Sequence, residues 1–68
     1  MFIIVDDTKT TPVFFRKLIP EVGVTVSMSM ADTILFKTKQ EAKEVFGIIP
    51  VNDMFKFRIA ELMVNPKL

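Results

Sequence analysis

The feature that most constrains this chain is a run of nine residues, 22–30, in which apolar and small side chains alternate strictly. A period of two places successive side chains on opposite faces of a β-strand. The run therefore predicts a strand with one buried apolar face and one face of small hydroxyl-bearing residues. The expected buried residues are Val24, Val26 and Met28, and the expected outward-facing residues are Thr25, Ser27 and Ser29.

Three further segments have the composition of strands. Residues 2–5 are continuously apolar and mostly β-branched, which is typical of a central strand buried on both faces. Residues 13–18 resume this composition after Pro12, and the Pro and Gly within residues 19–23 predict a turn. Residues 54–64 fit either a strand or a helix, and we favour a strand because Phe57 and Ile59 alternate with cations.

One short helix is predicted after these strands. Thr38 and Glu41 have the spacing of a capping box, in which the two side chains satisfy backbone N–H groups of the first helical turn. The helix should begin at Lys39, run for about two turns and end at Gly47 in a left-handed turn. We expect Ala42, Val45 and Phe46 to pack on strand residues, namely Ile3, Val5, Val26, Phe57 and Ile59. The prediction is a single α+β domain, residues 1–68, with an antiparallel sheet of three to five short strands and one short helix packed on one face.

The residue types that are missing exclude several kinds of site. The chain has 68 residues and contains no Cys and no His. Disulfides, structural zinc sites and nucleophile–imidazole catalysis therefore have no side chains to use. We expect no enzyme, no metal and no cofactor. A domain this small, without such staples, is commonly stabilised by self-association, so we expect a homo-oligomer, with a dimer as the first expectation.

The oligomer interface is predicted on the alternating segment. Half of the residues are apolar, which exceeds what we expect one small protomer to bury. Methionine-rich surfaces form adaptable contacts, although the same residues can also simply fill a core. The proposed interface residues, joined by sheet-face packing or by edge pairing, are Val24, Val26, Met28 and Met30.

The cations allow two interpretations. The net charge is only +1, so bulk electrostatics favour no class of partner. Basic residues beside phenylalanines on strands are typical of single-stranded nucleic-acid binding, and lysines near a helix start favour anions. Phenylalanines in the core with solvated cations outside fit the same pattern. The candidate partner-binding or anion-binding residues are Arg16, Lys17, Lys39, Lys43, Lys56 and Arg58.

Asp6 and Asp7 follow the first predicted strand, a position where metal-binding and catalytic carboxylates also occur. No calcium-loop spacing of acidic residues accompanies them. We therefore interpret both as turn-forming residues.

Residues 36–46, Phe-Lys-Thr-Lys-Gln-Glu-Ala-Lys-Glu-Val-Phe, resemble a recurrent pattern in small phage proteins. These proteins have strands, a helix with the pattern Phe-x-(Ser/Thr)-x-x-Glu-Ala, and a closing strand similar to residues 57–62 here. The resemblance implies a non-enzymatic host-takeover or anti-defence factor that acts in the host cytoplasm by occluding a host protein. The alternative that we keep open is a binder of a small ligand such as a nucleotide, or of single-stranded nucleic acid.

Overall fold

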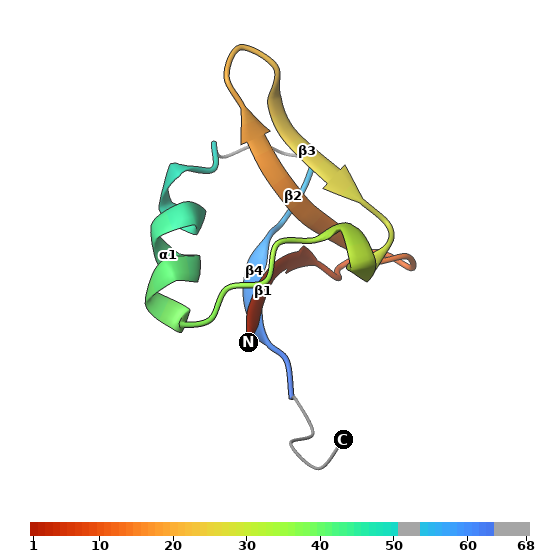
Figure 1. Ribbon diagram of the computed structural model, residues 1–68. Helices are drawn as coiled ribbons and strands as arrows, with labels where there is room; N and C mark the ends of the chain where they lie inside the picture. The colour runs from red at the N-terminus through yellow and green to blue at the C-terminus, as the bar shows by residue number, and fades with distance from the viewer. Residues whose placement is uncertain (51–53, 64–68) are drawn as a thin grey trace.

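The computed structural model describes residues 1–50 and 54–63, which form an antiparallel sheet and one α-helix (Figure 1). The strands are β1 (Phe2–Asp6), β2 (Val13–Ile19), β3 (Gly23–Ser27) and β4 (Arg58–Glu61), in the order β3-β2-β1-β4. A 3₁₀ helix, η1 (Met30–Asp32), precedes the helix α1 (Lys39–Ile48). For the residues described, the α+β prediction is confirmed, since the four antiparallel strands fall within the expected three to five and one short helix packs on one face.

β1 lies inside the sheet, as its apolar sequence predicts. It pairs with β2 through Val5 and Phe14, and with β4 through Ile4 and Ile59. Its middle residues, Ile3, Ile4 and Val5, are all buried. The helix α1 lies against β1 and β4, while the β2–β3 hairpin extends away from it (Figure 1).

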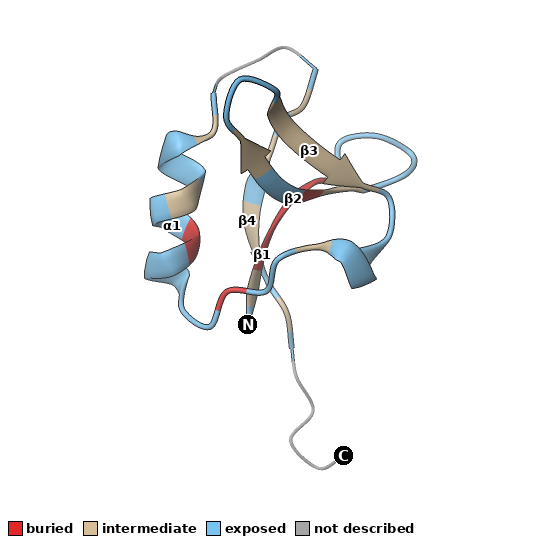
Figure 2. Ribbon diagram, turned by 45° about the horizontal axis from the view of Figure 1, so that its top comes forward, coloured by how far each residue is buried: buried red, intermediate tan, exposed pale blue. Residues whose placement is uncertain are grey.

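The hydrophobic core lies between α1 and the sheet. Its buried members are Ile4, Phe15, Phe36 and Ala42. Packed around them are half-buried residues from every strand and from the helix: Phe2, Leu18, Val24, Val45, Ile49, Phe57 and Ile59. Figure 2 shows buried residues along β1, in part of β2, in the segment that leads into α1 and on one part of the helix, most of which is exposed.

The prediction that Ile3 and Val5 pack under the helix is wrong. Ile4 belongs to the core cluster, so its neighbours in the strand point to the opposite face of the sheet. Every residue from Phe2 to Val5 is apolar, so the sequence contains no alternation that distinguishes the two faces of β1. The predicted contribution of Phe57 and Ile59 to the core is confirmed.

The start of α1 agrees with the sequence, and its end does not. The Thr38 hydroxyl accepts a hydrogen bond from the Glu41 N–H and donates one to the Glu41 carboxylate, both at 3.2 Å. Gly47 does not terminate the helix, because α1 continues to Ile48. Ile49 adopts an extended conformation, ψ 124°, immediately before Pro50. A residue preceding proline is driven out of the helical region, so the proline sets the end of the helix.

The predicted inward face of α1 is also partly wrong. Ala42 and Val45 pack on the core, but Phe46 is 38% exposed. The helix runs one residue past Gly47, to Ile48. Ile49, which follows it, packs against the core in the role predicted for Phe46.

A bulge shapes the β2–β3 hairpin. Phe15 pairs with Val26, and Lys17, two residues later, pairs with Thr25, which is directly adjacent to Val26. Arg16 is therefore an extra residue in β2. Because of this extra residue, Leu18 lies on the same face of the sheet as Phe15, although the two are three positions apart in sequence. Leu18 pairs with Val24. Both valines of β3 therefore share the face that carries the core, although β3 itself contains no fully buried residue.

β3 ends earlier than its alternation predicts. Beyond Ser27 the chain bends, because the Ser29 N–H donates to the Ser27 hydroxyl, which in turn donates to Asp32. Such local side-chain hydrogen bonds compete with strand pairing. Met28 is 73% exposed, so the prediction that it is buried in the strand is wrong.

Candidate functional site

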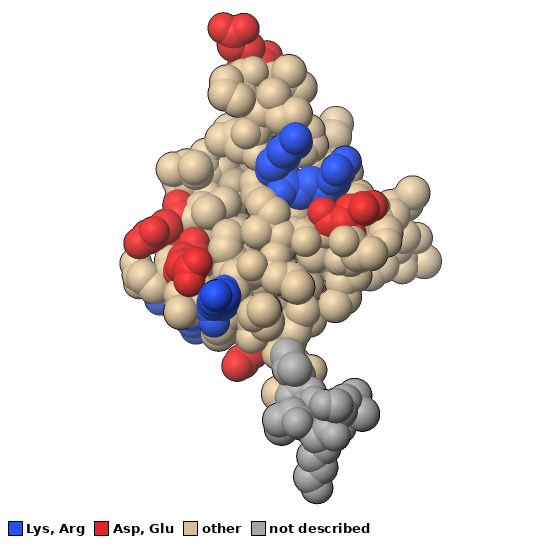
Figure 3. Space-filling model, in the orientation of Figure 1, with Lys and Arg blue, Asp and Glu red and all other residues tan. Residues whose placement is uncertain are grey.

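The six candidate cations lie on several surfaces. Lys39 and Lys43 are exposed on α1, whereas Lys17 and Arg58 lie on the sheet face turned away from the helix. Arg16 and Lys56 are exposed at the bulge of β2 and just before β4. Figure 3 shows charged side chains scattered over the face in view, with wide uncharged areas between them. The structure therefore does not gather the cations into one site.

Two of the phenylalanines beside these cations, Phe55 and Phe57, pack against other side chains of the protein. Phe57 meets Phe15 edge to face, with ring centroids 6.1 Å apart, and lies 5.4 Å from Phe55. The Lys9 ammonium sits 4.8 Å from the centre of the Phe55 ring. These contacts favour the interpretation of Phe55 and Phe57 as packing residues, since their ring surfaces already have neighbours.

Asp6 joins two segments that are distant in the sequence. Its side chain is completely buried, and one carboxylate oxygen accepts hydrogen bonds from the backbone N–H and the hydroxyl of Thr8. The other oxygen accepts the N–H of Lys56 at 3.1 Å and lies 3.5 Å from the Lys9 ammonium. These donors, above all the Thr8 hydroxyl, hold the pKa of Asp6 far below its usual range. Asp6 is thus ionised, and both of its carboxylate oxygens accept hydrogen bonds that connect the end of β1 to the segment before β4.

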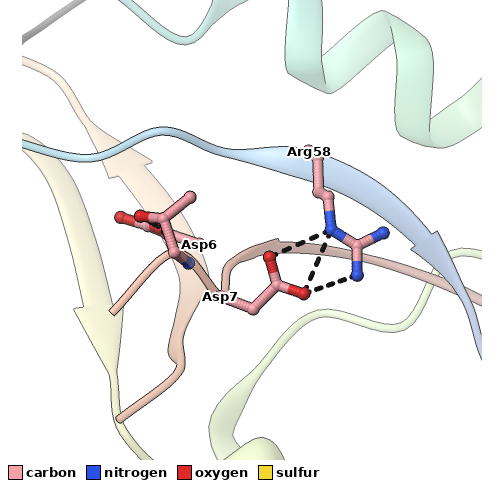
Figure 4. Close-up of polar contacts among 4 residues, drawn as sticks. Asp6, Asp7 and Arg58 are labelled. Carbon is pink, nitrogen blue, oxygen red and sulfur yellow. Dashed lines mark hydrogen bonds and ion pairs between the residues drawn. The ribbon is translucent and has the colours of Figure 1, made fainter. Parts of the chain in front are cut away.

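Asp7 lies on the other face and pairs with β4 (Figure 4). Its two carboxylate oxygens share the single Arg58 Nε–H, at 3.1 and 3.2 Å, and one of them also accepts a hydrogen bond from the Arg58 Nη2 at 2.6 Å. The contact lowers the pKa of Asp7 and raises that of Arg58. Arg58 is therefore already paired with an anion. In the described residues, 1–50 and 54–63, no group of three or more acidic residues could hold a metal ion.

The strongest candidate for a functional surface is the edge of the sheet at β3, where no other described residue pairs with the strand on the side away from β2. This strand lies at the end of the sheet, and its sequence, Gly-Val-Thr-Val-Ser, carries no charge. Edge strands of soluble monomers commonly carry charged residues, prolines or bulges that prevent pairing with other chains. β3 has none of these features, since the bulge of this hairpin lies in β2. We call β3, with its flanking residues Val22 and Met28, the β3 edge.

Exposed apolar side chains flank this strand at both ends. Val22 precedes β3, Met28 follows it, and each is 73% exposed. Met30, in η1, is 47% exposed. Of the predicted interface residues, Val24 and Val26 thus lie half-buried within β3, and Met28 and Met30 lie exposed just beyond its end.

Comparisons with protein-family models, with curated proteins and with solved structures found no match to this chain. Within the part of the chain that the structure describes, no helix is long and apolar enough to cross a membrane.

Two features of this region have no signal in the sequence. Asp6 forms the expected turn with Thr8, but its bond to the Lys56 N–H spans 50 residues. The Lys9 ammonium donates to the Met54 carbonyl at 2.6 Å, a contact between residues 45 positions apart. The alternation that predicted β3 was the one available signal for the β3 edge.

Proposed function

We propose that this chain is a non-enzymatic binding protein that self-associates through the β3 edge. The observation that carries the proposal is a sheet edge without charge, proline or bulge, flanked by the exposed Val22 and Met28. Burying such apolar surface against another protein is favourable in water. A non-enzymatic role is supported by the absence of His and Cys from the sequence and by the bonded, ionised state of Asp6.

The partner of the assembled protein is, in this proposal, a host protein whose functional site it occludes in the cytoplasm. The resemblance of residues 36–46 to small phage proteins supports this choice. The weak net charge supports it as well, because a protein surface does not require the strongly basic field that nucleic acid does. The alternative, a binder of nucleotides or single-stranded nucleic acid, has less support, since the cations are dispersed and the Phe rings have packing neighbours.

The first test is size-exclusion chromatography with light scattering, refractive-index detection and absorbance at 260 nm. The chain has no Trp and no Tyr, so a strong band at 260 nm belongs to a bound molecule. A mass above one protomer without this band supports the proposal. A monomer contradicts it, and a strong band supports the nucleotide alternative.

A pair of variants tests whether the β3 edge is responsible. Met28→Asp places a charge beside the strand and should reduce the mass in solution, because a carboxylate resists burial in an interface. Met63→Asp is the matched control, since Met63 follows β4 and is 94% exposed. Equal masses for both variants and for the natural chain would place the interface elsewhere.

A further inference from the structure

We infer that two copies of the chain join β3 to β3 in antiparallel orientation, about a two-fold axis that passes beside Thr25. The two sheets then form one continuous sheet across both copies. This inference rests on the proposed self-association and adds its geometry, namely the strand used, its direction and its register.

The chemistry of β3 suits pairing with a second copy in particular. A two-fold axis places each residue near its own counterpart, so a charged edge strand would bring like charges together. β3 has no charged residue between Gly23 and Ser27, and self-pairing therefore carries no such penalty. The opposite edge, β4, contains Arg58 and Glu61 and lies against α1, so it does not offer the same surface.

The distribution of side chains selects the register. Directly opposed residues in an antiparallel pair point to the same face of the sheet. With the axis at Thr25, Val24 lies opposite the partner's Val26, and the core-bearing faces of both copies stay on one side. Pairing valine opposite threonine would instead join the apolar face of one copy to the polar face of the other. An axis at Val24 or Val26 also keeps the apolar faces together, but it pairs only part of β3. The axis at Thr25 pairs all five residues of the strand, Gly23–Ser27.

The same register brings together the exposed apolar residues that flank the strand. Val22 and Met28 are equally distant in sequence from Thr25, and both are 73% exposed. Pairing centred on Thr25 brings the turn that carries Val22 near the bend that carries the partner's Met28, just beyond each end of the shared ladder. Side chains that are costly to leave in water in the single chain thus gain a common neighbour.

Charge complementation at Thr25 tests the axis directly. Thr25→Lys and Thr25→Glu each put two like charges side by side, so each variant alone should dissociate, with the dimer Kd raised about 100-fold or more. An equimolar mixture pairs Lys with Glu and should recover the mass of a dimer. Thr10→Lys is the matched control, because Thr10 is exposed in the β1–β2 loop, and it should leave the mass unchanged. Light scattering over a concentration series measures each mass.

The outcomes separate this inference from the proposed function. A monomeric natural chain contradicts both. A dimeric natural chain whose Thr25 variants remain dimeric overturns the axis and leaves self-association standing. Dissociated variants that do not associate when mixed also overturn the axis.

Cysteine substitution provides a second test in case a charged variant does not fold. The natural chain has no cysteine, so Thr25→Cys introduces the only thiol. Opposed residues at such an axis have Cα atoms about 4.5–5.5 Å apart, within the range of a disulfide. Oxidation should link most of the Thr25→Cys chains into covalent dimers, and far fewer of the Thr10→Cys chains. Equal yields for the two variants would overturn the inference.

Discussion

The two halves of the sheet differ in how they are held. The β1–β4 half lies against α1, contains the buried Ile4 and is tied by two carboxylates, Asp6 to the N–H of Lys56 and Asp7 to Arg58. The β2–β3 half extends beyond the helix, and β3 has no buried residue, no charge and no ion pair. The first half thus uses its side chains within the protomer. In the second half β2 still contributes Phe15 to the core, and it is β3 that leaves surface available for association. Segments with little internal burial are the usual source of binding surfaces.

The largest expected difference between the halves is in the cost of shortening a buried side chain. Ile4→Ala should lower the free energy of unfolding by about 3 kcal/mol, because it leaves a cavity between α1 and the sheet. Val24→Ala, in the half-buried β3, should cost about 1 kcal/mol. Urea unfolding followed by far-ultraviolet circular dichroism measures both, at low protein concentration so that association contributes little. Equal losses would show that β1 and β3 are packed equally.

The next largest effect concerns the carboxylate that ties the β1–β4 half together. In Asp6→Asn, an amide NH₂ replaces one of the two oxygens that accept hydrogen bonds from Thr8 and Lys56. At least one buried donor then loses its acceptor, and the Tm should fall by about 10 °C. Asp7→Asn is the control, because its ion pair with Arg58 is exposed, and it should change the Tm by about 3 °C or less.

The same carboxylate should make stability depend on pH in the acidic range. The pKa of Asp6 is lowered on folding from an unfolded value of about 3.9, so the unfolded chain binds the proton more tightly. Its stabilising contribution is complete above about pH 5 and declines as the pH falls through 4 towards the folded pKa. The slope of Tm against pH in that window should be smaller for Asp6→Asn than for the natural chain. Unchanged slopes would contradict the assignment of this role to Asp6.

The sequence predicted what local chemistry determines. The helix start at Lys39 follows from Thr38 and Glu41, and the central position of β1 follows from an uninterrupted apolar run. The predicted end of the helix at Gly47 is wrong because Pro50, and not the glycine, ends the helix. The glycine only permits a left-handed turn, whereas the proline restricts the residue before it.

The candidate site was predictable in part for the same reason. The alternation identified β3 and its valines, but Met28 continues the pattern beyond the point where the Ser27 and Ser29 bonds end the strand. The bulge at Arg16 depends on how β2 pairs with β3, and the bond from Lys56 N–H to Asp6 joins segments 50 residues apart. Periodicity within one segment does not contain that information.

A smaller effect is expected at the N-terminus of the helix that covers the β1–β4 half. Thr38→Ala removes the acceptor for the Glu41 N–H and should lower the free energy of unfolding by about 1 kcal/mol. Thr38→Ser keeps the hydroxyl and should recover most of that loss. Urea unfolding measures both variants. A loss of the same size in both would mean that the threonine methyl group, rather than the cap, matters here.

The smallest expected effect lies at the tip of the β2–β3 half and has the opposite sign. Glu21 is the third residue of a turn closed by the Val22 N–H and the Ile19 carbonyl, and its φ is 68°. This left-handed conformation costs a residue with a Cβ about 1–2 kcal/mol, whereas glycine adopts it freely. Because glycine also loses more chain entropy on folding, Glu21→Gly should raise the free energy of unfolding by only about 0.5 kcal/mol.

Glu21→Ala separates backbone strain from charge at this position. Alanine keeps the Cβ and therefore the strain, so this variant should show no gain, although it removes the same carboxylate. If both variants gave the same increase in urea unfolding, relief of charge would be the cause. If only Glu21→Gly is more stable, Glu21 adopts a backbone conformation that a residue with a Cβ disfavours. The β1–β4 half, in contrast, is stabilised by the contacts of its own side chains, such as those of Asp6 and Asp7.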